Sequence, residues 1–331
     1  MHGFLRWGAA IGGALIIVIL LAVGVVEALG RRTWNDVSVP PLAVRDDPAL
    51  VTRGEYLVNS VAHCPACHLP LPAAKTFNPL ARPDLKGGHT WELPFGRIVS
   101  ANITPSRTFG IGDWSDGEIA RVLQSGVRRD GHLSVFMQVG VGALSNDDVA
   151  AIIAYLRAQP AIDEPVPEGR VSFLGRAVAA FAVRPRGDGA PAEAPRMEAS
   201  VERGGYLVRG PANCIGCHSP SGIGSGFLPT APLLAGGLPA PDETDPAMEI
   251  VAPNLTPDEP TGVATYWSED DFVARFRGGR VVAGSPMPWE AFTAMTDTDL
   301  AAIWRYLRTI APVHNNVGPT HRPMGSFRPT P

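Results

Sequence analysis

All four cysteines of the chain lie in two copies of one short motif, Cys64-Pro65-Ala66-Cys67-His68 and Cys214-Ile215-Gly216-Cys217-His218. At this spacing, two thiols can add to the two vinyl groups of a porphyrin, and the adjacent histidine then lies beneath the iron as its proximal ligand. The motifs therefore predict two haem c groups, each bound covalently. The residues expected to hold them are Cys64, Cys67, His68, Cys214, Cys217 and His218.

A redox pair or a zinc site is the alternative use of a Cys-x-x-Cys spacing. A structural zinc needs a second pair of ligands, about 12 to 20 residues further along the chain. Neither motif is followed by such a pair, and both motifs carry the histidine. Haem attachment is therefore the favoured interpretation.

A methionine follows each motif at the same interval. Met137 comes 69 residues after His68, and Met287 comes 69 residues after His218, although only 7 of the 331 residues are methionine. Methionine commonly fills gaps in a core, but the matched interval favours Met137 and Met287 as the sixth iron ligands. Ligation by histidine and methionine leaves no open coordination position, so each iron would carry single electrons and bind no substrate.

The two methionines differ in their surroundings. Met287 has a proline on each side, which stiffens a loop, whereas Met137 is followed by Gln138. His132, five residues before Met137, is an alternative ligand for the first iron. The sixth ligand of the first haem therefore stays open between Met137 and His132.

The likeness between the two motifs extends into their surroundings. Two further pairs of segments match, Arg53-Gly54-Glu55-Tyr56-Leu57-Val58 with Arg203-Gly204-Gly205-Tyr206-Leu207-Val208 and Asn102-Ile103-Thr104-Pro105 with Asn254-Leu255-Thr256-Pro257. Tyr155-Leu156-Arg157 likewise has a counterpart in Tyr306-Leu307-Arg308. A duplicated haem domain explains these matches, and the copies are expected over residues 45–160 and 201–311. Asn102 and Asn254 are either haem-edge residues or ordinary turn residues.

Each copy is expected to be small and mainly helical. One helix is predicted over residues 50–62, a short helix near Ser115 and near Ser268, and a closing helix over 146–158 and over 298–309. The Gly/Pro-rich stretch after each motif is expected to be irregular backbone. Residues 161–200 are expected to form a helix and a linker, and residues 312–331 an irregular tail.

The amino-terminal segment, residues 1–34, is expected to anchor the chain in a membrane. Nineteen uncharged, mainly apolar residues run from Gly8 to Val26, and as a helix they would span roughly 28 Å. Trp7 and Trp34 lie near the two ends, where aromatic side chains favour the interface. A cleaved signal peptide is the alternative, although its apolar core would be unusually long.

The orientation of this segment involves a conflict. Arg31 and Arg32 after the segment outweigh Arg6 before it, which favours a cytoplasmic location for the rest of the chain. Covalent haem attachment instead requires export, so we expect a single-pass protein of the inner (cytoplasmic) membrane with its haem domains in the periplasm. The net charge of −4 and the lack of a basic stripe exclude nucleic acid as an expected partner.

The order of these motifs resembles that of the membrane-bound cytochrome c subunits of bacterial periplasmic alcohol, aldehyde and gluconate dehydrogenase complexes. The resemblance covers both haem segments. It implies a mainly α chain of two tandem class I cytochrome c domains preceded by one transmembrane helix. It also implies a non-catalytic subunit that accepts electrons from a periplasmic dehydrogenase catalytic subunit and passes them to the respiratory chain, through the quinone pool or a terminal oxidase.

The chain departs from that family in two respects. Many members carry three haem domains, whereas this chain has two motifs, and Met137-Gln138 stands where the family typically shows Met-Pro.

Three other functions are alternatives. A dihaem peroxidase would need an open iron position, which a symmetric His/Met pair disfavours. A thiosulfate-oxidising cytochrome would need a further cysteine ligand. A membrane-tethered shuttle between respiratory complexes remains as an alternative.

Overall fold

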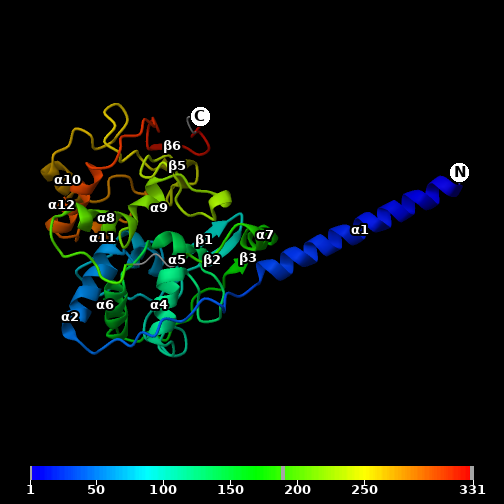
Figure 1. Ribbon diagram of the computed structural model, residues 1–331, viewed down its shortest axis with the longest axis horizontal. Helices are drawn as coiled ribbons and strands as arrows, with labels where there is room; N and C mark the ends of the chain where they lie inside the picture. Colours follow the sequence, from blue (N-terminus) through cyan, green and yellow to red (C-terminus); the bar gives the residue numbers. More distant parts are fainter. Residues whose placement is uncertain (1, 188–190, 329–331) are drawn as a thin grey trace.

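The computed structural model describes residues 2–187 and 191–328 of the chain. It is mainly helical, as predicted, and begins with a long apolar helix, α1 (His2–Gly30), which projects from the rest of the molecule (Figure 1). The helical elements of the first half are α2 (Pro48–Tyr56), η1 (Leu57–Val61), α3 (Pro65–His68), η2 (Ala73–Lys75), α4 (Asp116–Ser125), α5 (Val135–Gly140) and α6 (Asn146–Arg157). After α7 (Phe173–Phe181), the second half contains α8 (Val201–Arg209), α9 (Cys214–His218), η3 (Ile223–Ser225), α10 (Glu269–Arg277), α11 (Trp289–Phe292) and α12 (Asp297–Leu307). Small parts of the expected anchor, linker and tail, at residues 1, 188–190 and 329–331, lie outside the described residues.

Each half is built on a crossing of two helices, α2 with α6 and α8 with α12. Glycine is needed at both crossings. A Cβ atom at Gly54 would lie 1.9 Å from the carbonyl oxygen of Ala151, and one at Gly204 would lie 1.9 Å from that of Ala302. This close approach explains the glycine in both copies of Arg-Gly-x-Tyr-Leu.

Side-chain caps fix where the other helices begin. Ser115 and Ser268 each form a capping box at the start of α4 and α10. Ser145 and Thr296 accept hydrogen bonds from backbone N–H groups in the first turn of α6 and α12. The helix predicted over residues 50–62 is interrupted, because α2 ends at Tyr56 and passes into the π-helical turn η1.

Two small antiparallel sheets are present, and most of their strands lie in the Gly/Pro-rich stretches or the tail that were expected to be irregular. One sheet has the order β1 (Thr90–Leu93), β2 (Gly96–Val99) and β3 (Arg170–Val171), and the other β4 (Pro239–Pro241), β5 (Met248–Val251) and β6 (His321–Pro323). β3 and β6 come from beyond the closing helix of their half, so part of the expected tail is a strand. Strands of two to four residues are too short to show an alternating apolar pattern in the sequence.

The two halves share one hydrophobic core. Buried side chains such as Leu57 and Ile153 from the first half and Leu207, Leu300 and Trp304 from the second belong to a single contiguous cluster. The halves are therefore packed against each other as one body. This shared core is what holds the two motifs in a fixed relation.

The helix α1 includes a segment, Ile11–Gly30, that is long and apolar enough to cross a membrane. Its end packs on α7. Trp7 is 75% exposed, whereas Trp34 is half-buried beneath the guanidinium of Arg32, which lies 3.9 Å from the ring centroid. Trp34 thus contacts protein at the place where it was expected to meet the membrane interface.

Candidate haem-attachment sites

Each Cys-x-x-Cys-His motif forms one short helix, α3 in the first half and α9 in the second. The residue before the first cysteine has a left-handed backbone in both halves, with φ of 42° at His63 and 46° at Asn213. The preceding helices have already ended, at Val61 and at Arg209, so this turn lies directly before the new helix that the motif begins. The same local backbone therefore presents both pairs of thiols.

The thiols are free, since neither pair forms a disulfide. Burial raises the pKa of the Cys64 thiol to about 12 and that of the Cys214 thiol to about 12. The burial of Cys64 and Cys214 thus favours the neutral thiol. Among the described residues, no group of three or more His, Cys, Asp or Glu side chains is arranged to hold a metal ion.

Both motif histidines are oriented by a matched hydrogen bond. Nδ1 of His68 lies 2.8 Å from the carbonyl oxygen of Ala101, and Nδ1 of His218 lies 2.9 Å from that of Pro253. Donation from Nδ1 leaves Nε2 as the nitrogen that can bind a metal. Burial lowers the pKa of both imidazoles, which favours the neutral form that iron binding requires.

The Asn-x-Thr-Pro segments hold these carbonyl groups in place. Asn102 is 2% exposed, and its Oδ1 accepts hydrogen bonds from the backbone N–H and the hydroxyl of Thr104. Asn254 and Thr256 form the same turn in the second half. The turn expected from the sequence is observed, and it positions the residue that accepts from the motif histidine.

The residues present therefore fit a c-type haem at both motifs. Each motif offers two unpaired thiols and one neutral imidazole whose Nδ1 is already bonded. Cys64, Met137, Cys214 and Met287 all pack against the shared core.

Met137 lies on α5 and is half-buried, whereas His132 is exposed. The side chain of His132 is 47% exposed, and its Nδ1 lies 3.5 Å from Asp130. Gln138 is buried and donates from its amide to the carbonyl oxygens of Ser125 and Arg184, at 3.1 and 2.8 Å. A glutamine after Met137 thus fixes α5 by hydrogen bonds.

Met287 lies in a loop held by two cations. Arg280 donates to the carbonyl oxygens of Ser285 and Met287, at 2.5 and 3.2 Å, and pairs with Glu290. Lys75, from the first half, donates to the carbonyl oxygen of Ser285 at 3.0 Å. The Met287 loop is therefore positioned partly by the other half of the molecule, a contact that no local sequence pattern indicates.

The two motifs are close to each other in space. Burial, together with the nearby Glu243 and Cys217, raises the pKa of Cys67 to about 11. Lys75 and Glu243 form an ion pair across the two halves beside these cysteines. Each motif also contacts the other half of the molecule. The helix α11 of the second half packs on α3 of the first, and the side-chain amide of Asn213 donates to the carbonyl oxygen of Val139 at 2.6 Å.

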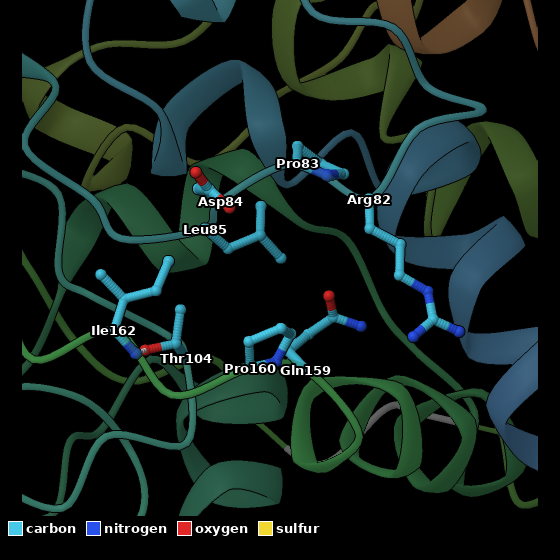
Figure 2. Close-up of a pocket in the computed structure, with 8 residues that line it drawn as sticks. All are labelled: Arg82, Pro83, Asp84, Leu85, Thr104, Gln159, Pro160 and Ile162. Atoms are coloured by element: carbon cyan, nitrogen blue, oxygen red, sulfur yellow. Dashed lines mark hydrogen bonds between the residues drawn. The ribbon is translucent and has the colours of Figure 1, made fainter.

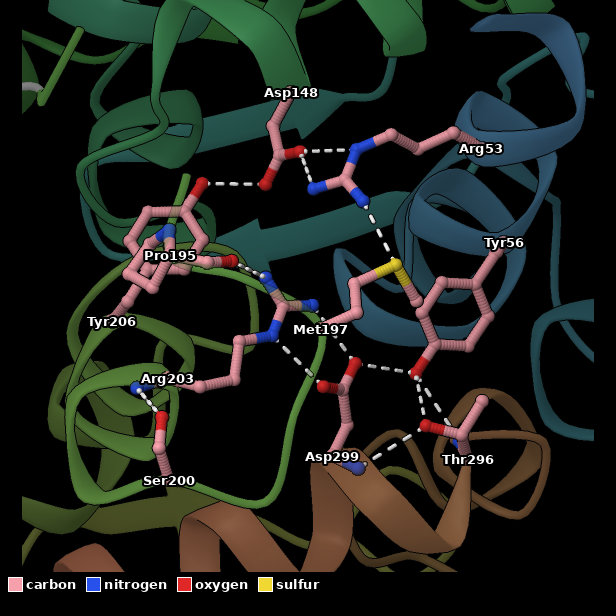
Figure 3. Close-up of polar contacts among 10 residues, drawn as sticks. All are labelled: Arg53, Tyr56, Asp148, Pro195, Met197, Ser200, Arg203, Tyr206, Thr296 and Asp299. Carbon is pink, nitrogen blue, oxygen red and sulfur yellow. Dashed lines mark hydrogen bonds and ion pairs between the residues drawn. The ribbon is translucent and has the colours of Figure 1, made fainter. Parts of the chain in front are cut away.

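A reciprocal set of polar contacts joins the halves (Figure 3). Asp299 is paired with Arg203 of its own half, and it accepts a hydrogen bond at 2.7 Å from Tyr56 of the first half. The same arrangement occurs in the other direction. Asp148 is paired with Arg53 and accepts a hydrogen bond at 2.6 Å from Tyr206.

The Arg-Gly-x-Tyr repeat is thereby explained residue by residue. Its arginine binds a buried aspartate in its own half, its glycine permits the helix crossing, and its tyrosine reaches the aspartate of the other half. The sequence alone did not reveal these aspartates, which lie among several acidic residues at helix starts. We call this set of two arginines, two aspartates and two tyrosines the interdomain lock.

The first half contains a small cavity (Figure 2). It is lined by Arg82, Pro83, Asp84, Leu85, Thr104, Gln159, Pro160 and Ile162. Its volume of about 40 Å³ accommodates about three water molecules. None of the predicted haem-binding residues lines it, and it is too small for a porphyrin.

The chain was compared with protein-family models and with known proteins. No protein-family model matches the chain. The cytochrome c subunit of a quinone-type alcohol dehydrogenase from Gluconacetobacter polyoxogenes is 30% identical over 82% of this chain and 58% of its own length. The cytochrome c subunit of gluconate 2-dehydrogenase from Pantoea cypripedii is 30% identical over 81% of this chain and 62% of its own length. A dihaem c-type cytochrome from Cereibacter sphaeroides is 29% identical over 81% of this chain and 90% of its own length.

The chain therefore spans about three fifths of these dehydrogenase subunits and most of the dihaem cytochrome. These relatives are electron-transfer subunits and a cytochrome, not catalytic subunits, and their names identify haem c as the cofactor for which the motifs are built. The resemblance found from the motifs is thereby confirmed. The chain is a homologue of the cytochrome c subunits of alcohol and gluconate dehydrogenase complexes and of a dihaem c-type cytochrome.

Proposed function

We propose that the chain is an electron-transfer subunit with two haem c groups, held in tandem class I cytochrome c domains over residues 45–160 and 201–311. The observation that carries the proposal is the matched pair of motif histidines, each with Nδ1 bonded to the backbone carbonyl that precedes an Asn-x-Thr-Pro turn. When bound, the haems supply one-electron redox centres. The chain's own residues attach them, orient the imidazoles and keep both sites in one rigid body.

The proposed attachment residues are Cys64, Cys67, Cys214 and Cys217, and the proposed axial ligands are His68, His218, Met137 and Met287. Met137 is preferred to His132 because it is half-buried against the shared core, whereas His132 is exposed. The position of Met287 is supported by the cationic contacts to its loop. With both axial positions filled by protein, neither site would bind a substrate.

We further propose that a periplasmic dehydrogenase catalytic subunit donates the electrons and that the quinone pool or a terminal oxidase receives them. The names of the relatives support a dehydrogenase partner. In this proposal α1 anchors the chain in the inner membrane, and both haem domains face the periplasm. This orientation is required by the export that precedes covalent haem attachment.

Purification from native membranes in mild detergent tests the partner. The expected result is a complex in which a dehydrogenase subunit accompanies the cytochrome. Addition of that enzyme's substrate to the purified complex should reduce the haems. A cytochrome that purifies without any dehydrogenase, and that a respiratory complex reduces instead, would favour the tethered-shuttle function.

Replacement of single methionines tests the axial ligands. Met287→Ala and Met137→Ala should each abolish the sulfur-to-iron absorption band of one haem and lower the potential of that haem, because thioether ligation raises the potential. Met295→Ala is the matched control, since Met295 is a buried core residue that is not proposed as a ligand. A Met137→Ala protein with an unchanged band and potential would show that another residue is the sixth ligand of the first haem.

A further inference from the structure

The helix α7 lies against the last turn of α1. A Cβ atom at Gly30 would lie 2.5 Å from the carbonyl oxygen of Arg176, so the two helices are in direct contact there. Arg176 also donates from Nε to Glu27 at 2.7 Å, and Arg32 donates to the carbonyl oxygen of Val183 at 3.1 Å. These contacts fix α7 at the level where the apolar segment Ile11–Gly30 ends.

Large apolar side chains are exposed along α7. Phe173 is 45% exposed, Leu174 is 49% exposed and Phe181 is 61% exposed. Leu174 and Phe181 are seven residues apart and so lie on the same side of the helix. The opposite side, with Gly175 and Ala180, is buried against the protein. The side of α7 that carries Leu174 and Phe181 is therefore apolar and largely open to the surroundings.

Exposed arginines lie close in the sequence to the ends of both helices. Arg31 follows α1 directly and pairs with Glu27 at 3.1 Å, whereas Arg170 precedes α7 and Arg184 follows it. Arginine side chains at this level interact favourably with the phosphate groups of anionic lipids. An apolar helix face flanked by arginines is the pattern of a helix that lies in a membrane interface.

We propose that α7 is an interfacial helix whose Leu174 and Phe181 side chains insert among the lipids beside α1. The inference rests on the proposed anchoring by α1, because that anchoring sets the depth of α7. A bilayer is favoured over a protein as the occupant, since α7 is bound to the very turn at which α1 leaves the apolar layer. The contact would hold the haem domains in one orientation relative to the membrane instead of leaving them free to tumble on a single helix.

Photo-crosslinking of the full-length haem-loaded chain tests this contact. Benzoylphenylalanine replaces Phe181 in one protein and Tyr266 in a control. Tyr266 is an aromatic residue that is 80% exposed, and it lies three residues before α10. Figure 1 shows α10 at the far side of the molecule from α1. Both proteins are placed in vesicles of phosphatidylethanolamine and phosphatidylglycerol, irradiated, and analysed by mass spectrometry.

The expected result is lipid adducts at position 181, at least tenfold more abundant than at position 266. The proposal is overturned if lipid adducts are no more abundant at position 181 than at position 266. It is also overturned if irradiation in native membranes joins position 181 to a protein. Alkaline extraction of the same vesicles separates the two levels of the argument. A chain that is released would refute the anchoring by α1 itself, whereas a retained chain without lipid adducts would refute only the interfacial role of α7.

Discussion

Removal of one tyrosine hydroxyl from the interdomain lock should weaken the whole molecule. In Tyr56→Phe, the buried carboxylate of Asp299 loses a hydrogen bond of 2.7 Å while its pairing with Arg203 remains. A hydrogen bond to a charged, buried group contributes about 1.5–3 kcal/mol to stability. Tyr206→Phe removes the equivalent bond to Asp148 and should cost a similar amount. Against a total stability of about 5–15 kcal/mol, this loss is easily measured.

The assay is urea unfolding of the haem-loaded chain in mild detergent, followed by far-ultraviolet circular dichroism and by haem absorbance. Tyr306→Phe is the matched control, because among residues 2–187 and 191–328 the Tyr306 hydroxyl has one hydrogen bond, which it accepts at 3.0 Å from the exposed side chain of Arg209. That variant should lose no more than about 1 kcal/mol. Equal losses in all three variants would refute the argument, since the lock would then contribute no more than a surface contact.

Three further predictions concern charge and the turns. Burial and the lock aspartates raise the pKa of Tyr56 and of Tyr206. As the pH rises above about 10, the unfolded chain loses these protons at a lower pH than the folded chain does, so the free energy of unfolding should fall. The Tyr56→Phe/Tyr206→Phe protein should show a shallower fall in urea titrations at increasing pH. Asn254→Ala should cost about 1–3 kcal/mol through its lost turn bonds and should broaden the electron paramagnetic resonance signal of one haem only. Lys75→Met should lower at least one reduction potential by tens of millivolts, and Glu243→Gln should raise at least one by a similar amount. The reason is that a unit charge within roughly 10 Å, at an effective dielectric constant of about 20, contributes on the order of 1–2 kcal/mol. Shifts of the opposite signs in potentiometric titration would refute the electrostatic argument.

Much of the local structure was predictable from the sequence. The caps at Ser115, Ser145, Ser268 and Thr296 and the apolar spacing of the closing helices fix those elements through interactions within a few residues. The glycine, arginine and tyrosine of the repeated Arg-Gly-x-Tyr segment also appear in the sequence as a pattern. What the pattern does not state is which distant atom each side chain meets.

The contacts between the halves were not predictable for that reason. The pairing of Tyr56 with Asp299 joins residues 243 positions apart, and Lys75 reaches the Met287 loop across 210 positions to Ser285. The strand β6 is similarly formed from a segment with no apolar period, because its partner β5 supplies the hydrogen bonds. Such features depend on packing between elements, which a motif or a spacing does not encode.

The central claim is that one chain carries two covalently attached haems, and intact-mass measurement of the purified protein under denaturing conditions tests it most directly. We predict a mass that exceeds that of the polypeptide by two haem groups and an iron content of two per chain, with Cys217→Ala disturbing attachment only at the second motif. A mass equal to that of the bare polypeptide, or bound zinc in place of iron, would contradict the account.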